Sequence, residues 1–208
     1  MSQQIRLFVI GDSISIHYGP YLEKFLPDRF HYDRKRDAGA EKAEANLDIP
    51  SGANGGDSRM VLDYLRLRRK HSPIPADLLL LNCGLHDVKT NIGTGARQVS
   101  SRDYEENLEA ILEIVKAAGW RLLWVHTTPV VDAVHNRPGA SFHRHAPDVE
   151  AYNAIASRLM EAAGVATIDL HAFSAKFAPE GFCDHVHYNE EVRALQGAFI
   201  AGRLSAIA

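Results

Sequence analysis

Short apolar runs alternate with longer amphipathic stretches along the chain. Residues 6–10, 76–83, 121–126 and 165–170 are nearly continuous in apolar side chains, so each is expected to form a buried strand. A strand that is apolar on both sides belongs to a sheet whose two faces are both covered. The alternation therefore predicts an α/β fold in which helices cover both faces of a parallel sheet.

The amphipathic stretches between these runs predict helices. The clearest begins at Ser100, carries apolar residues at helical spacing from Tyr104 to Val115, and ends at Gly119, a suitable C-cap. The other expected helices cover residues 16–26, Asp57 or Ser58 to Lys70, Asp148 to Gly164, and a last helix capped by Asn189 with Val192, Leu195 and Phe199 facing inward. The segment 30–56 is the hardest to interpret and contains a candidate second strand near residues 45–49.

Length and charge narrow the class of protein. With 208 residues, the chain is expected to form a single domain over residues 1–208. The net charge of −3 disfavours a nucleic-acid-binding protein, which needs a basic face. The basic cluster at residues 66–70 falls at a predicted helix end, where cations stabilise the helix dipole. The two cysteines form no disulfide framework, and Cys83 is expected to be buried.

The first residues lead to an expectation of a cytoplasmic protein. Met1–Gln4 is followed directly by an apolar strand, without the basic region, apolar stretch and cleavage site of a secretory leader. No apolar run approaches the roughly 18 residues that span a membrane. We therefore expect no membrane span.

Polar residues stand at the ends of the predicted strands, where ligands of a parallel sheet bind. Gly11-Asp12-Ser13 follows the first strand, and Gly84-Leu85-His86-Asp87 follows the strand at 76–83. Asp184-His185-Val186-His187 precedes the last helix. Together these segments supply a hydroxyl, an imidazole and a carboxylate. Acyl transfer by a serine needs these three groups, because the serine must be activated by a base whose tautomer is fixed by an acid.

The spacing of Asp184 and His187 suits such a pair. Residues three positions apart can lie side by side in a turn, so Asp184 can accept a hydrogen bond from Nδ1 of His187 while Nε2 faces Ser13. His185 is the competing base. Adjacent residues point in different directions, and we prefer His187.

Gly-Asp-Ser occurs twice, at residues 11–13 and 56–58. Only the first copy directly follows an apolar strand, so Ser13 is the candidate nucleophile, whereas Ser58 is expected to cap a helix. A backbone N–H at Gly55-Gly56, before that helix, is well placed to stabilise an oxyanion. The alternative interpretation makes Ser13 a turn residue that caps the following helix.

The sequence blocks that carry chemistry are Gly11-Asp12-Ser13, Gly56, Gly84-x-His86-Asp87 and Asp184-x-x-His187. They resemble the four blocks of the SGNH (GDSL-type) hydrolases, in that family's order and over nearly the whole chain. The resemblance implies a three-layer α/β/α flavodoxin-like fold with a parallel sheet of about five strands, and ester hydrolysis without a metal or other cofactor. By position, Ser13 matches the nucleophile, His187 the base and Asp184 its partner. Gly56 matches the glycine whose N–H joins that of Ser13 in the oxyanion hole.

One position departs from the family pattern. The third block usually carries an asparagine that donates a hydrogen bond to the oxyanion, and the matching residue here is His86. A neutral imidazole can donate through one ring nitrogen, so we expect His86 to serve as an oxyanion donor. The alternative is that His86 braces a loop and the oxyanion hole has two donors. Asp12 and Asp87 are expected to support the loops beside the reacting groups.

Two other functions fit parts of the sequence. A metal hydrolase could use His135, His143 and His145 together with the residues around Asp184, but no His-Glu-x-x-His or paired-cysteine spacing is present. A binding module could hold a phosphate at the first loop, but Asp12 would repel it and no P-loop lysine follows. The Gly-x-Ser-x-Gly elbow of α/β-hydrolases is absent from the sequence.

The sequence says least about the substrate. The resemblance covers esterases for acetylated sugars and short acyl esters, lysophospholipases and thioesterases. Residues 88–100 and 130–147 are expected to line the pocket, and they are polar and rich in histidine, with Phe142 the only aromatic residue apart from histidine. We therefore expect a small-molecule partner, an acetyl or other small acyl ester of a polar alcohol or carbohydrate. A lysophospholipase or thioesterase is the alternative.

Overall fold

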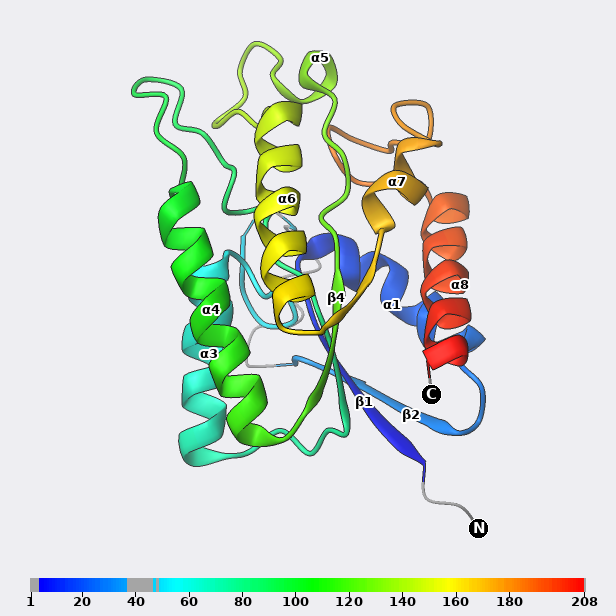
Figure 1. Ribbon diagram of the computed structural model, residues 1–208. Coiled ribbons are helices and arrows are strands. Elements are labelled where there is room, and N and C mark those ends of the chain that lie inside the picture. Colours follow the sequence, from blue (N-terminus) through cyan, green and yellow to red (C-terminus); the bar gives the residue numbers. More distant parts are fainter. Residues whose placement is uncertain (1–3, 37–46, 48, 208) are drawn as a thin grey trace.

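The computed structural model describes residues 4–36, 47 and 49–207 (Figure 1). Five strands pair in parallel in the order β2-β1-β3-β4-β5. Their bounds are β1 Ile5–Ile10, β2 Phe30–Arg34, β3 Leu78–Leu81, β4 Arg121–Val125 and β5 Ala166–Ile168. The prediction of a parallel α/β sheet of about five strands is confirmed.

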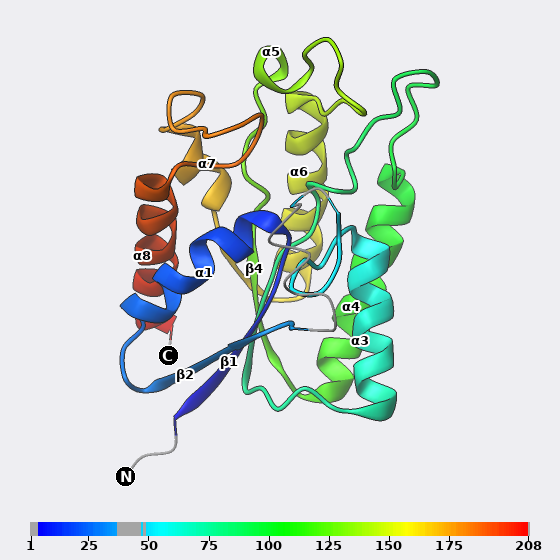
Figure 2. The same cartoon turned by 180° about the vertical axis from the view of Figure 1, so that it is seen from behind.

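Helices cover both faces of this sheet. Their bounds are α1 Ser13–Phe25, α3 Ser58–His71, α4 Ser101–Ala118, α5 Asp132–His135, α6 Ala146–Ala162, α7 Leu170–Ala175 and α8 Glu190–Ile207. α1 packs against α8, and α7 also contacts α8, whereas α4 packs between α3 and α6 (Figures 1 and 2). The result is three layers, with the sheet in the middle. Among the described residues, no helix is long and apolar enough to cross a membrane.

The most apolar strand lies at the centre of the sheet. All four leucines of β3 are buried, and the strand pairs with β1 on one side and β4 on the other. Helices pack on both faces, so both sets of side chains are shielded from water, which explains the unbroken apolar run in the sequence. Cys83, two residues beyond the strand, is also buried, as expected.

The boundaries predicted for α4 are confirmed almost to the residue. Ser100 is its N-cap, with the side chain accepting a hydrogen bond from the backbone N–H of Asp103. Gly119 ends the helix with a φ of 71°, a left-handed conformation that glycine adopts without strain. The apolar stripe from Tyr104 to Val115 faces the core. A helix with both caps and a clear period is therefore readable from its residues alone.

Other boundaries differ from the predictions. α1 begins at Ser13 and not at residue 16, and β2 lies at Phe30–Arg34. The candidate strand near residues 45–49 falls mostly outside the described residues. The last strand ends at Ile168 and α7 follows it. Leu195, expected to face inward on α8, is 40% exposed.

Residues 130–147, expected to line the pocket and called the 130–147 loop below, contain α5, and α6 begins before Asp148, where that helix was expected to start. His145 and not Asp148 occupies the N-cap position of α6. Asp148 lies in the first turn of that helix, and its carboxylate accepts a hydrogen bond from Arg97 at 2.5 Å. A carboxylate is favourable both at the N-cap and in the first turn of a helix, so the sequence does not show which of these two positions Asp148 occupies.

Candidate active site

Ser13 lies at the junction of β1 and α1. Asp12 is the N-cap of α1, its side chain accepting a hydrogen bond from the N–H of Ile14, so Ser13 is the first residue of the helix and not its cap. Ser13 is buried, and its Oγ lies 2.8 Å from Nε2 of His187. Its own N–H belongs to the first turn of α1, where N–H groups have no acceptor within the helix and carry partial positive charge.

Asp184 and His187 share one turn before α8. Oδ2 of Asp184 lies 2.7 Å from Nδ1 of His187, and Oδ1 accepts hydrogen bonds from the N–H groups of Val186 and His187, both at 2.8 Å. Partial burial acts to raise the pKa of Asp184, but these hydrogen bonds lower it more, so the pKa lies well below its usual range. The carboxylate therefore remains ionised and fixes the ring of His187.

His185, the competing base, does not reach Ser13 in this arrangement. Its ring centroid lies 5.9 Å from that of His187, and its Nδ1 lies 3.8 Å from Oδ1 of Asp184. The other side of the His185 ring meets His135, with the centroids 4.8 Å apart. The structure brings His187, and not His185, to the serine.

The sequence analysis did not single out His17, which packs edge-on against His187. The ring centroids lie 5.1 Å apart, at an interplanar angle of 64°. Burial, together with the positive charges of Arg193 and His187, lowers the pKa of His17 to about 3. His17 follows Ser13 by four positions on α1, and this helical spacing is the signal that could have found it.

The second Gly-Asp-Ser segment lies against the end of β1. The N–H of Gly55 donates to the carbonyl of Gly11 at 2.8 Å, and a Cβ atom at Gly55 would lie 3.1 Å from that oxygen. The two backbone segments therefore approach closely, and a glycine at position 55 permits this approach. The N–H of Gly56 donates to Oδ1 of Asn54 at 2.9 Å, so this expected oxyanion donor already has an acceptor.

The prediction that Ser58 caps α3 is wrong. Asp57 is the N-cap, and its side chain accepts a hydrogen bond from the N–H of Met60. Ser58 is the first helical residue, and its Oγ accepts a hydrogen bond from Nδ2 of Asn107 at 2.9 Å. Aspartate and serine cap helices equally well, so two adjacent candidates cannot be ranked from sequence.

His86 lies in the turn after β3 and is 1% exposed. The residues on either side of it are held by other loops. The carbonyl of Leu85 accepts a hydrogen bond from Nε of Arg144 at 2.8 Å, and both oxygens of Asp87 accept from the N–H of Ser58 at 2.9 and 3.0 Å. Burial raises the pKa of Asp87 to about 7, although its hydrogen bonds with Ser58 act against this rise. The turn is therefore fixed between α3 and the 130–147 loop.

The histidines of the 130–147 loop are held in polar contacts. Nη1 of Arg144 lies 3.0 Å from Nε2 of His135, which must accept because a guanidinium can only donate. Nδ1 of His145 lies 2.8 Å from Oδ2 of Asp132, and the ring of His143 packs 6.0 Å from that of His145. In the part of the chain that the structure describes, no three histidine, cysteine or acidic side chains are grouped so that they could hold a metal ion.

A second serine–histidine–aspartate contact lies elsewhere in the fold. Oγ of Ser157 lies 2.9 Å from Nε2 of His126, whose Nδ1 lies 3.4 Å from Oδ1 of Asp169. Ser157 stands in the middle of α6 and its Oγ donates to the carbonyl of Asn153 at 2.8 Å. Backbone N–H groups inside a helix are bonded within the helix, so they offer no donors for an oxyanion. This contact serves below as a control.

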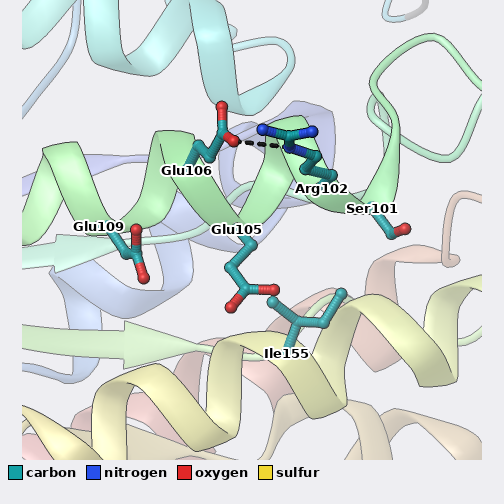
Figure 3. Close-up of a pocket in the computed structure, with 6 residues that line it drawn as sticks. All are labelled: Ser101, Arg102, Glu105, Glu106, Glu109 and Ile155. Atoms are coloured by element: carbon teal, nitrogen blue, oxygen red, sulfur yellow. Dashed lines mark hydrogen bonds and ion pairs between the residues drawn. The ribbon is translucent and has the colours of Figure 1, made fainter.

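Hollows lie on two sides of His187. His17 lines a cavity of about 370 Å³ at α1 and α8, and His185 lines one of about 450 Å³ at residues 137–142. A third hollow, between α4 and α6, contains none of the residues discussed above (Figure 3). It is lined by Ser101, Arg102, Glu105, Glu106, Glu109 and Ile155, with Arg102 paired to Glu106 at 2.9 Å.

One family model matches most of this chain. The model of the GDSL-like lipase/acylhydrolase family matches residues 9–195. No curated protein matches in sequence. A solved acetyl xylan esterase, AlAXEase, is 18% identical with a TM-score of 0.63, over 98% of this chain and 100% of its own.

Two other solved structures are similar over a comparable length. A lipase/acylhydrolase from Enterococcus faecalis is 14% identical with a TM-score of 0.68, over 98% of this chain and 96% of its own. A GDSL-like lipase from Bacteroides thetaiotaomicron VPI-5482 is 15% identical with a TM-score of 0.65, over 100% of this chain and 93% of its own. At these identities the likeness concerns the fold.

Proposed function

The chain belongs to the GDSL-like lipase/acylhydrolase family of ester-bond hydrolases, and we propose that it is a serine esterase acting through Ser13, His187 and Asp184. The observation that carries this proposal is the continuous contact from hydroxyl to imidazole to carboxylate, over distances of 2.8 and 2.7 Å. Each group lies within reach of the proton it must exchange. The favoured substrate is an acetyl or other small acyl ester of a polar alcohol or carbohydrate.

Acylation begins when Oγ of Ser13 attacks the carbonyl carbon of the ester. His187 takes the serine proton on Nε2 as the new carbon–oxygen bond forms. The resulting imidazolium is stabilised by Asp184, whose low pKa keeps it negative. Collapse of the tetrahedral intermediate expels the alcohol, which receives the proton from His187.

Deacylation repeats these steps with water as the nucleophile. His187 removes a proton from the water, which attacks the acyl-serine carbonyl. The second tetrahedral intermediate releases the carboxylic acid and returns the proton to Ser13. The proposed cycle uses side chains and backbone groups of this chain, and no metal or cofactor takes part in it.

Three donors are proposed for the oxyanion. The N–H of Ser13 lies at the positive end of α1, and His86 supplies an imidazole from the turn after β3. The N–H of Gly56 is the third donor. Since it donates to Oδ1 of Asn54, the oxyanion must share this N–H with the amide oxygen or displace it.

The proposed substrate class is supported by the surroundings of His187. The cavity beside His185 is lined mainly by polar and small side chains, with Phe142 its one large apolar residue among those described. This lining suits a polar alcohol better than a long apolar chain, which would need a larger apolar surface to be removed from water. The similar fold of an acetyl xylan esterase makes acetylated carbohydrates the first substrates to test.

A fluorophosphonate probe tests the nucleophile directly. The wild-type protein should gain one covalent label, read by intact mass and mapped to Ser13. The variant Ser13→Ala should lose the label and the hydrolysis of 4-nitrophenyl acetate. The variant Ser157→Ala, which removes the serine of the second contact, should keep both. Labelling that persists without Ser13 would refute the proposal.

A panel of 4-nitrophenyl esters from acetate to decanoate, together with acetylated sugars, tests the substrate class. We expect kcat/KM to fall as the acyl chain lengthens, as it should for an enzyme whose substrates are small acyl esters. A rate that rises steadily with chain length would favour the lysophospholipase alternative.

A further inference from the structure

We propose that the cavity beside His185 receives the alcohol part of the ester and selects alcohols that carry an anionic group. The cavity, of about 450 Å³, is lined by His135, His185 and residues 137–142. This inference rests on the proposed esterase function and names the substrate class more narrowly.

The mechanism requires the leaving alcohol to lie beside His187. Nε2 of His187 must donate a proton to the leaving oxygen, so the alcohol has to depart past this ring. The rings of His187, His185 and His135 follow one another, with centroids 5.9 and 4.8 Å apart, and the last two line the cavity. The cavity wall therefore begins one ring away from the proton donor, and the cavity volume is in the range of small-molecule sites.

Cationic side chains lie in and beside the cavity. Arg137 lines it, and among the described residues no carboxylate lies within ion-pair distance of its guanidinium, whose Nε donates to the carbonyl of Val134. The ring of Phe142 also lines the cavity. Lys89 Nζ lies 4.5 Å and Arg144 Cζ lies 4.8 Å from the centroid of this ring. A planar guanidinium with open donors binds carboxylate and phosphate groups well.

The carboxylates near the cavity, Asp184 and Asp132, lie outside its lining. None of the described lining residues is acidic. Asp184 is held by His187 and two backbone N–H groups, and Asp132 by His145 and the N–H of Ala146. An anionic group in the cavity would therefore meet the guanidinium of Arg137 directly, whereas a neutral alcohol would gain nothing from this charge.

The second cavity beside His187 offers no such selection. Its lining combines Arg193 with Glu190, which accepts a hydrogen bond from the hydroxyl of Tyr21 at 2.8 Å. Charges of both signs line this cavity, so it discriminates poorly between neutral and anionic groups. Glu190 is therefore a suitable control position.

The test compares kcat/KM for three acetyl esters that differ in the charge of the alcohol. These are an acetylated methyl glucoside, the matching methyl glucuronoside, and acetylated glucose 6-phosphate. At low salt the wild-type enzyme should prefer the two anionic esters by about tenfold, and the preference should shrink as added salt screens the cations. A higher kcat/KM for the glucuronoside would identify a carboxylate as the selected group, and a higher kcat/KM for the glucose 6-phosphate ester would identify a phosphate.

Three variants test which side chain causes the preference for anionic esters. Arg137→Gln should reduce the preference to within about twofold of unity, and Ser141→Glu, which places a carboxylate in the same lining, should reverse it. Glu190→Gln, in the other cavity, should leave the preference unchanged. Hydrolysis of 4-nitrophenyl acetate should stay within about twofold for Glu190→Gln, and thermal unfolding should show that Arg137→Gln and Ser141→Glu fold like the wild type.

Two outcomes would overturn the inference. Wild-type hydrolysis of neutral and anionic esters at equal rates would remove the selection while leaving the esterase function intact. A preference that survives in Arg137→Gln but changes in Glu190→Gln would move the alcohol to the other cavity. If no acetyl ester, 4-nitrophenyl acetate included, is hydrolysed, the esterase proposal itself fails and this inference fails with it.

Discussion

The contact between Ser13 and His187 joins residues 174 positions apart, whereas Asp184 and His187 share a single turn. The second contact is local, so its geometry follows from sequence spacing. The first depends on the topology of the sheet, which brings the end of β1 to the segment before α8. The proposed triad thus combines a contact that sequence spacing predicts, Asp184–His187, with one that depends on the fold, Ser13–His187.

His86 replaces the usual asparagine of its block, and its variants test whether it donates to the oxyanion. His86→Ala should lower kcat by about 100-fold or more, the typical effect of removing one oxyanion donor. His86→Asn should retain kcat within about tenfold, because the amide can donate in its place. Steady-state kinetics, with the folded state of both variants checked by thermal unfolding, provide the measurement. An alanine variant with wild-type kcat would show that His86 only braces the turn.

His17 should make the folded protein sensitive to acid. Its pKa is about 3 in the folded protein against 6.5 when unperturbed, so between these values the unfolded chain binds the extra proton. The free energy of unfolding should therefore fall by roughly 1 kcal/mol from this residue between pH 6.5 and 4.5, after allowance for its partial exposure.

Urea unfolding of the wild type and of His17→Phe at several pH values checks this expectation. The variant should lose less stability on acidification. Asp184, with its pKa lowered, acts in the same direction but at lower pH, since its contribution is present above its unfolded pKa and is lost only as pH falls through the folded one. Identical slopes for the two proteins above pH 4.5 would contradict the role of His17.

At the scale of helices, two glycines should respond to alanine with opposite signs. Gly119 ends α4 at a φ of 71°, and a Cβ atom there would meet open space, so Gly119→Ala should destabilise through backbone strain alone, by about 1 kcal/mol. Gly202 lies within α8, where a Cβ atom also meets nothing within 4 Å, so Gly202→Ala should stabilise by about 0.5–1 kcal/mol. Urea unfolding of both variants checks the pair, and shifts of the same sign would contradict the argument.

The elements that sequence predicts well are those whose burial is regular. β3 is apolar throughout and fully buried, and α4 carries one apolar stripe at helical spacing that faces the core. β2 has the sequence Phe30-His-Tyr-Asp-Arg34 at the edge of the sheet, where the buried side chain of Arg34 donates to the carbonyl of Ser15 at 2.8 Å. A strand that buries a charged side chain carries no apolar run, so its residues alone do not reveal it.

Short helices and caps are the other source of error. α5 has 4 residues and α7 has 6, too few for a helical period to emerge from the sequence. At α3 and α6 more than one polar residue stands near the start, and tertiary contacts decide which one caps. Asn107 donates a hydrogen bond to the hydroxyl of Ser58, and Arg97 donates one to the carboxylate of Asp148, so neither side chain caps its helix.

At the scale of the molecule, Arg144 ties the 130–147 loop to the turn that carries His86. It is 1% exposed, donates to the carbonyl of Leu85, and contacts His135. Its positive charge also reaches Asp12, where burial raises the pKa and this charge acts against the rise. One buried cation thus connects segments that follow three different strands.

Arg144→Leu should destabilise the protein by about 3 kcal/mol, because buried acceptors on Leu85 and His135 lose their donor. It should also lower kcat, since the turn that holds His86 would no longer be fixed. Arg158→Leu removes an exposed arginine that pairs with Glu105 at 2.7 Å, and should cost less than about 1 kcal/mol. Equal losses in urea unfolding for the two variants would contradict the proposed role of Arg144.

The sequence supports a partial prediction of the candidate site. Motifs at strand ends mark Ser13, His86 and the Asp184–His187 turn, because a parallel sheet brings strand ends to one edge. The hydrogen bond between Gly56 and Asn54 is not readable in the same way, since it depends on how one loop folds against β1. The cavity at residues 137–142 likewise needs the loop's conformation and not only its composition.

The distance along the chain between Ser13 and His187 has a consequence for biosynthesis. A ribosome adds His187 174 positions after Ser13, and α1 packs against α8, which follows His187. In the proposed mechanism the nascent polypeptide carries an inert alcohol over this interval, unable to attack cellular esters. The proposed reactivity arises only when α8 docks on α1, so the onset of probe labelling would time this step of folding.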